Sequence, residues 1–217
     1  MPATLWLTFL PCVVGVAAGL LIAALRVYKI RFWARLFGVV IPIIKAIPSI
    51  LVMYMTWFLF SDTFNIVAER AGWAIRSKDI DIIWVGIISL TLTAISIISE
   101  TFRGAFLSIG SGQYEAAFSV GLTRTQTMRR VIIPQMLPVA WPLLCSNIIT
   151  ILKASSLVYL IGVMEMLNGS LLSATSNYSY LPAYLGAAAL YWVLSIIIEQ
   201  CFRLTGKRFR AFHRGAA

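Results

Sequence analysis

Long runs without charge dominate the pattern of hydrophobic and polar positions along the chain. The five longest lie at Leu5 to Leu25, Ala46 to Ser61, Ile82 to Ser99, Val131 to Leu152 and within Met166 to Ile198. A helix needs roughly 20 apolar residues to cross about 30 Å of hydrocarbon. The second and third runs are short by this measure, but Lys45 and Asp81 lie at their ends, where polar side chains can reach the head groups. The pattern predicts an all-α integral membrane protein with about five transmembrane helices.

Composition agrees with this prediction. Of the 217 residues, 60% are hydrophobic and 12% are charged, which leaves too little polar surface to cover a water-soluble globule. No domain boundary, low-complexity segment or internal repeat is visible, so residues 1–217 are interpreted as a single transmembrane domain. The first run lacks a preceding basic segment and is about twice as long as a signal-peptide core, which indicates a retained helix.

The net charge of +10 raises the question of a nucleic-acid partner, and the distribution of the basic residues answers it. The connections after the first and third runs and a tail at about 203–217 carry basic clusters, and five spans place all three on one side. The positive-inside rule then places the amino terminus outside and the carboxyl terminus in the cytoplasm. We expect membrane lipid around the spans and no nucleic-acid partner. The clusters are Arg26, Lys29, Arg31 and Arg35; Arg103, Arg124, Arg129 and Arg130; and Arg203, Lys207, Arg208, Arg210 and Arg214.

No residues in the sequence indicate a catalytic or metal site. Cys12, Cys145 and Cys201 are far apart, without a Cys-x-x-Cys spacing, and His213 stands alone in the basic tail. The pair Gly206-Lys207 lacks the upstream glycine of a phosphate-binding loop. We therefore predict a non-catalytic membrane subunit that holds no cofactor of its own.

Two shorter patterns predict how helices pack. Gly15 and Gly19 form a small-xxx-small face, which indicates close packing within the domain, with a dimer contact as the alternative. Residues Arg31 to Ile44 mix basic and aromatic positions, as expected for an amphipathic helix in the cytoplasmic interface.

The polar stretch at about 103–130 is predicted to form two short helices on the cytoplasmic side. Ser111 and Gly112 are expected to open the first helix, Glu115 to complement its dipole, and Gly121 to end it in a left-handed turn. Thr123 and Gln126 have the spacing of a capping box, which starts the second helix. A solvated loop and a docking element for a soluble partner both remain open.

The second helix is expected to carry Arg129 and Arg130 at head-group depth and then to enter the membrane. Pro134, Pro138 and Pro142 follow at four-residue spacing, on one helical face. Because proline leaves a carbonyl without its helical partner, this span is predicted to bend and to pack inside protein.

These residues carry a resemblance to a known family. Glu115-Ala116-Ala117, Gly121 six residues after the glutamate, and Ile133-Pro134 before Leu137-Pro138 resemble the cytoplasmic loop of permease subunits in bacterial ATP-binding-cassette importers. The segments Glu100 to Ala105, Ile133 to Gln135, Lys153 to Leu157 and Lys45 to Pro48 are similar to motifs of the polar amino-acid uptake subfamily. The resemblance covers roughly residues 5 to 206.

The resemblance implies a five-helix permease domain in the bacterial cell (inner) membrane. The implied partners are a second permease subunit, identical or homologous, two ATP-binding subunits that hold ATP and Mg, and an extracellular or periplasmic solute-binding protein. By the same resemblance the ATPase-coupling residues are Glu115, Ala116, Ala117 and Gly121. The residues implied along the substrate path are Thr91, Thr93, Lys153, Ala154, Ser155 and Ser156.

The chain departs from the subfamily pattern at three places. Thr91-Leu92-Thr93 replaces S-L-N, Ala154 replaces an acid, and Lys45 replaces an arginine. Without the acid, the field beside Lys153 stays positive, which favours a neutral or acidic amino acid, or a similar small zwitterion, over arginine or lysine.

Lys153 is the most costly residue in a predicted span, at about 2.5 to 3.5 kcal/mol for a charge at mid-bilayer. It is expected to line a path or gate, or else to pair with helix-end carbonyls or a carboxylate. Glu100 and Glu199 are expected to pair with Arg103 or Arg203. The alternative functions are a proton-coupled secondary transporter that uses Lys153 and Glu100, and a membrane scaffold.

Overall fold

The computed structural model describes residues 1–176 and 178–214, with side chains up to Lys207. The described part is helical and contains no strand. Its elements, in chain order, are α1 (Pro2–Val27), α2 (Arg31–Ala46), α3 (Ser49–Arg70), a 3-10 turn (Ser77–Asp79), α4 (Ile83–Leu107), α5 (Ser111–Ser119), α6 (Arg124–Thr127), a π-helical turn (Met128–Ile132), α7 (Ile133–Ala154), a second 3-10 segment (Ser155–Ile161), α8 (Met166–Ala174) and α9 (Tyr180–Arg214).

The prediction of five spans is confirmed. Within the described residues, five helices are long and apolar enough to cross a membrane: Pro2–Val27, Ser49–Arg70, Ile83–Leu107, Arg124–Ile161 and Tyr180–Lys207. The run from Met166 to Ile198, however, is not one helix. It breaks after Ala174, in a polar stretch where Tyr178 has a φ of +55°, and the fifth span begins at Tyr180.

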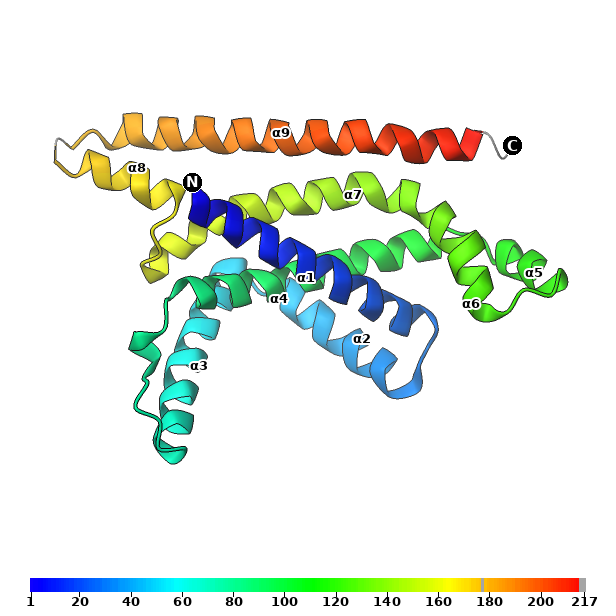
Figure 1. Ribbon diagram of the computed structural model, residues 1–217, viewed down its shortest axis with the longest axis horizontal. Coiled ribbons are helices and arrows are strands. Elements are labelled where there is room, and N and C mark those ends of the chain that lie inside the picture. The colour runs from blue at the N-terminus through cyan, green and yellow to red at the C-terminus, as the bar shows by residue number, and fades with distance from the viewer. Residues whose placement is uncertain (177, 215–217) are drawn as a thin grey trace.

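Helices α1, α4, α7 and α9 run roughly alongside one another, as Figure 1 shows, while α3 diverges from them. The most extensive contact joins α1 to α4, and further contacts join α4 to α7 and α7 to α9. The described part of α9 has few buried side chains, so one side of the molecule is left uncovered by this chain.

Two glycines allow α1 to approach α4 closely. A Cβ added at Gly15 would lie 2.8 Å from the Ala94 Cβ, and one added at Gly19 would lie 3.0 Å from the Ser99 nitrogen. Real Cβ atoms essentially never approach other atoms as closely as 2.8 Å and seldom as closely as 3.0 Å, so larger residues would force the helices to shift apart. The interpretation that this face packs within the domain is confirmed.

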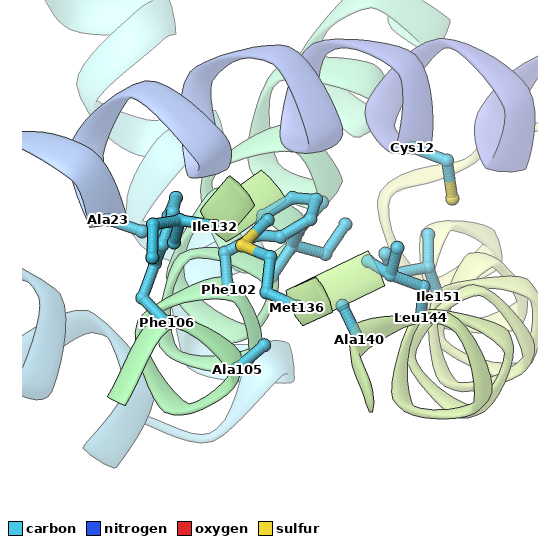
Figure 2. Packing of buried hydrophobic residues seen from close by; sticks show 12 residues of the cluster. Cys12, Ala23, Phe102, Ala105, Phe106, Ile132, Met136, Ala140, Leu144 and Ile151 are labelled. Atoms are coloured by element: carbon cyan, nitrogen blue, oxygen red, sulfur yellow. The ribbon is translucent and has the colours of Figure 1, made fainter. Parts of the chain in front are cut away.

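The main hydrophobic cluster joins α1, α4 and α7. Figure 2 shows Ala23 of α1 and Phe106 of α4 beside Ile132 and Met136 of the fourth span, all of them buried. A second cluster, centred on Leu7, Met53, Val85 and Val158, ties α3 and the 3-10 segment to the other half of α1 and α4. Burial of apolar surface in the two clusters holds α1, α3, α4 and the fourth span together.

The fourth span changes its helical geometry near its prolines. A π-helical turn at Met128–Ile132 precedes Pro134, and Pro138 and Pro142 lie inside α7. Pro134 and Pro138 are half-buried, but Pro142 is exposed in this chain, so the predicted packing inside protein would need a partner chain at Pro142. Its place on the helix continues the face of α7 that no other helix of this chain covers.

The three basic clusters gather at one end of the molecule, as predicted. Figure 1 shows the α1–α2 connection, α5 with α6, and the carboxyl-terminal end of α9 at the same end, with the amino terminus and α8 toward the opposite end. Of the basic tail, Arg208, Arg210, His213 and Arg214 lie outside the described side chains. Helix α2 corresponds to the helix predicted for the cytoplasmic interface. It buries Ile41 and contacts α1 and α4.

Candidate functional site

The first short helix, α5, begins at Ser111 as predicted, but its first turn lacks the acid expected to complement its dipole. Gly110 is its N-cap and Ser111 its first residue, and no side chain caps this end. Glu115 is the fifth residue and the first turn holds no acid, so the predicted dipole role of Glu115 is wrong. A dipole partner must lie within the first turn, and the glutamate side chain is instead exposed one turn further on.

The turn after α5 has the predicted geometry. Gly121 has a φ of +80°, in the left-handed region that favours glycine. The Thr123 backbone N–H donates to the Gln126 Oε1 at 2.9 Å, and the Gln126 backbone N–H donates to the Thr123 Oγ1 at 3.3 Å. These bonds form the capping box of α6 and fix its direction relative to α5. We call residues 111–127 the α5–α6 hairpin.

The α5–α6 hairpin presents a mixed surface to its surroundings. Ala117 is buried, whereas Glu115 and Ala116 are exposed. Beyond them, Phe118 is 46% exposed and Val120 is 77% exposed. An apolar pair beside a carboxylate on a projecting hairpin is typical of a surface that docks onto another protein.

One hydrogen bond that the sequence did not predict joins the hairpin to the fourth span. The Gln135 Nε2 donates to the Gln113 Oε1 at 2.9 Å. Gln135 lies in the segment similar to L-P-Q, but nothing in the sequence identified Gln113 as its partner. Tyr114 adds an apolar contact to the main cluster, so α5 is attached to the spans by both polar and apolar contacts.

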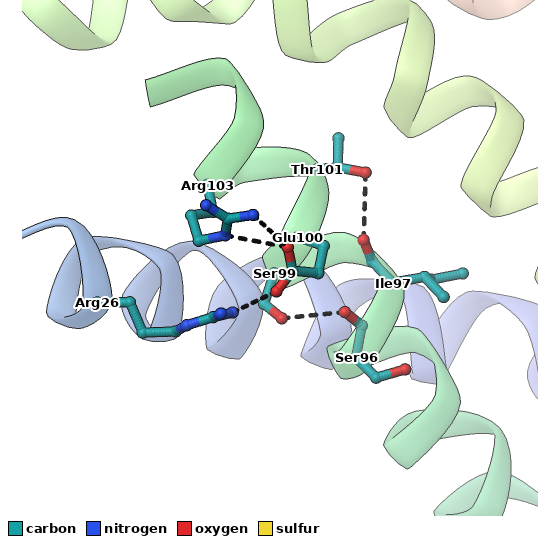
Figure 3. Close-up of polar contacts among 7 residues, drawn as sticks. All are labelled: Arg26, Ser96, Ile97, Ser99, Glu100, Thr101 and Arg103. Carbon is teal, nitrogen blue, oxygen red and sulfur yellow. Dashed lines mark hydrogen bonds and ion pairs between the residues drawn. The ribbon is translucent and has the colours of Figure 1, made fainter. Parts of the chain in front are cut away.

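A cluster of charges joins the carboxyl-terminal parts of α1 and α4, as Figure 3 shows. The Arg103 Nε donates to the Glu100 Oε2 at 3.0 Å, which confirms the predicted pair. Arg26 of α1 donates to the other carboxylate oxygen, and the sequence did not predict this partner. Glu199 has no ion pair among the described residues, so its predicted pairing with Arg203 is wrong.

The predicted path residues of α4 are half-buried. The Thr91 hydroxyl donates to the Ile87 carbonyl at 2.6 Å, and the Thr93 hydroxyl donates to the Ser89 carbonyl at 3.2 Å. Each hydroxyl donates to its own helix and keeps a lone pair free, so it can accept a hydrogen bond from a solute.

The predicted path residues at the end of α7 and the start of the following 3-10 segment point in different directions. Lys153 is exposed and has no ion pair among the described residues. Ala154 packs against the second hydrophobic cluster, and Ser155 is fully buried, its hydroxyl donating to the Leu152 carbonyl at 2.7 Å. Ser156 is half-buried and donates to the Lys153 carbonyl. Lys153 and Ala154 therefore do not lie on one surface.

The surface that does contain Lys153 is a polar face of α7. Ser146, Thr150 and Lys153 follow one another at four- and three-residue spacing, and all three are exposed. The Thr150 hydroxyl donates to the Ser146 carbonyl at 2.9 Å. Ser146 and Thr150 were not predicted from the sequence, although their helical spacing from Lys153 could have identified them.

At the opposite end of the molecule, Glu165 is buried but its hydrogen bonds are satisfied. It accepts from the backbone N–H groups of Leu167 and Asn168 and from the Tyr191 hydroxyl, each at 2.8 Å. It therefore caps α8 and ties that helix to α9. These bonds assign Glu165 to holding the fold together.

Comparisons with known proteins agree on one family. The family model described as "Binding-protein-dependent transport system inner membrane component" matches residues 15–211. The histidine/lysine/arginine/ornithine transport system permease protein HisQ of Salmonella typhimurium is 30% identical over 208 residues, which are 95% of this chain and 90% of HisQ. The L-cystine transport system permease protein TcyL of Bacillus subtilis is 29% identical, over 97% of this chain and 85% of TcyL.

A solved structure agrees as well. The crystal structure of an amino acid ABC transporter with histidines contains a chain with a TM-score of 0.78 and 27% sequence identity to this chain. The match covers 96% of this chain and 91% of the other.

Proposed function

The chain belongs to the family of inner membrane components of binding-protein-dependent transport systems and is a permease subunit of an ATP-binding-cassette importer, and we propose that the polar face of α7 lines its translocation path. The observation that carries this proposal is Lys153, an exposed cation near the end of a span. A charge facing lipid is costly, and the exposed hydroxyls of Ser146 and Thr150 continue the same face deeper into the span, which favours water or protein beside it.

A second permease chain would supply that environment. This chain leaves the polar face of α7 and most of α9 uncovered, so one copy cannot enclose a path. Two copies, or one copy and a homologue, would close the polar face around water and leave α9 toward lipid or the partner. A solute-binding protein would deliver the solute from outside.

The energy would come from two ATP-binding subunits that hold ATP and Mg. In this proposal Glu115, Ala116 and the exposed Phe118 of the α5–α6 hairpin seat in a groove of the ATPase. Gly121 sets the angle to α6, and Gln113 transmits displacement to Gln135 of the fourth span. Closure of the ATPase dimer would then move the hairpin as a rigid element and switch access of the path.

The topology follows from the basic end of the molecule. The three basic clusters lie at one end, which we assign to the cytoplasm by the positive-inside rule. The amino terminus then lies outside and the carboxyl terminus inside the cell, in a bacterial inner membrane. An engineered cysteine at Gly112 should react with an impermeant reagent only after the membrane is opened, whereas one at Gly169 should react in intact cells.

The proposed solute is a neutral or acidic amino acid, or a similar small zwitterion. Lys153 would attract a carboxylate, and the hydroxyls of Ser146 and Thr150 can bind polar groups without selecting charge. None of the three residues on this face is an acid that would favour a cationic side chain. A homologous partner permease that carries such an acid would alter this preference.

Co-purification and uptake test the proposal together. The chain should co-purify with an ATPase, and its uptake of amino acid should be inhibited by vanadate. Uptake abolished by a protonophore yet unaffected by ATP depletion would instead support the proton-coupled carrier, for which the comparisons give no support. Lys153→Gln should lower uptake while ATPase binding persists, and Lys78→Gln, at an exposed cation outside the spans, is the matched control.

A further inference from the structure

A cavity of about 440 Å³ lies at the basic end, where the ends of α1 and α4 meet the α5–α6 hairpin. Val27, Phe106, Ile109 and Phe118 form its apolar wall. Its volume falls within the range of small-ligand pockets. The cavity is separate from the polar face of α7, but its wall residue Phe118 also belongs to the exposed surface beside Glu115 and Val120.

Thr127, one of the residues that line the cavity, has a hydroxyl group without a hydrogen-bond partner. Thr127 is 1% exposed, and its Oγ1 makes no hydrogen bond. Helical threonines elsewhere in the chain, such as Thr56 and Thr150, donate to the carbonyl four residues earlier. A buried polar atom that lacks even this bond indicates a missing partner.

Two cations stand at the same cavity. Lys29 and Arg124 line it, and neither has an ion pair among the described residues. Lys29 has a φ of +52°, which is unusual for a residue other than glycine. Among the residues that the structure describes, no carboxylate lines the cavity, so its field favours an anion.

Two phenols complete the polar side of the cavity. Burial raises the pKa of Tyr28, Tyr114 raises it further, and Arg124 opposes the increase. Burial also raises the pKa of Tyr114. Both phenols therefore stay neutral at physiological pH and can donate hydrogen bonds to an oxyanion.

We infer that this cavity binds the phosphate head group and the first part of an acyl chain of an anionic phospholipid from the cytoplasmic leaflet. The cations and hydroxyls suit the phosphate, and the apolar wall suits the acyl chain. Free phosphate alone would leave this wall in contact with water. A lipid here would bridge α1 and α4 to the α5–α6 hairpin. The inference rests on the topology proposed above, since it needs this end at the cytoplasmic surface.

The test uses the purified permease–ATPase complex and native mass spectrometry. The complex is equilibrated with vesicles of phosphatidylglycerol and phosphatidylcholine, and retained lipid is counted. We expect retention of phosphatidylglycerol, and a loss on the order of tenfold in a variant that combines Lys29→Gln with Arg124→Gln. A variant that combines Arg129→Gln with Arg130→Gln removes two neighbouring charges that do not line the cavity, and it should retain lipid like the wild type.

Two further measurements identify the ligand and test the role of the Thr127 hydroxyl. Thr127→Val keeps the side-chain shape, and it should reduce phosphatidylglycerol retention without changing the amount of assembled complex. Inorganic phosphate should not displace the lipid, and displacement at millimolar phosphate would assign the cavity to free phosphate instead.

Equal lipid loss in the Arg129 and Arg130 variant, or equal retention of both lipids, would overturn the inference. Cysteine labelling at Gly112 reports the topology separately, so the two proposals can fail independently.

Discussion

Gln135 at the start of the fourth span donates a hydrogen bond from its Nε2 to the Oε1 of Gln113 on α5, over 2.9 Å. The two side chains are 22 positions apart in the sequence, and their contact ties the α5–α6 hairpin to the span that carries Lys153. The bond is exposed, so its value to stability is small. Because it joins the hairpin surface proposed to meet the ATPase to the span that carries Lys153, we expect it to transmit motion between them.

The first prediction concerns this bond. Gln113→Leu or Gln135→Leu should lower uptake per ATP hydrolysed by roughly two- to tenfold, the range expected for one hydrogen bond. The double variant should cost no more than one single variant, because the two changes remove the same contact. Gln200→Leu, at an exposed glutamine of α9, is the control. Additive losses in the double variant would show that the two glutamines act separately.

The second prediction concerns the turn of the hairpin. Gly121→Val places a β-branched side chain at a φ of +80°, which costs about 1 to 2 kcal/mol. The permease should still insert, while ATPase attachment or stimulation weakens. Gly112→Ala, in open space within α5, should behave as wild type. Normal ATPase recruitment and normal uptake in the valine variant would reduce the hairpin to a connector.

The third prediction concerns the approach of α1 to α4. Gly19→Val should lower the amount of folded permease, because a Cβ at this position would lie 3.0 Å from the backbone nitrogen of Ser99. Overpacking of this kind typically costs about 1 to 3 kcal/mol. Gly38→Val, where nothing lies within 4 Å of the added Cβ, tests whether any new side chain on a helix has this effect. Equal yields from both variants would contradict the packing account.

Local signals account for the parts of this structure that the sequence predicted. Charge-free runs predicted the five spans, and the spacing of Thr123 and Gln126 predicted a capping box, because each depends on a few adjacent residues. The left-handed turn at Gly121 could be predicted for the same reason, since only the local backbone conformation decides it.

Contacts between distant segments could not be predicted in this way. Arg26 and Glu100 are 74 positions apart, and the sequence offered Arg103 and Arg203 as equally reasonable partners for an acid at a span end. The direction of Ala154 was missed for a different reason, because helical spacing along α7 was not applied to it. Helical spacing turns it away from Lys153 toward the second cluster, although the two residues are adjacent in the chain.

The last prediction concerns the solute and rests on Lys153. This side chain is exposed on a span, and Thr150 and Ser146 continue its face without adding a negative charge. A carboxylate of the solute can therefore pair with the lysine, whereas a solute with a cationic side chain meets repulsion that no acid on this face offsets. In a competition assay, neutral and acidic amino acids should inhibit uptake more strongly than arginine and lysine. Lys153→Gln should weaken inhibition by acidic amino acids most, because they lose the larger attraction. Inhibition by arginine and lysine alone would overturn the assignment and would direct attention to an acid on the partner permease.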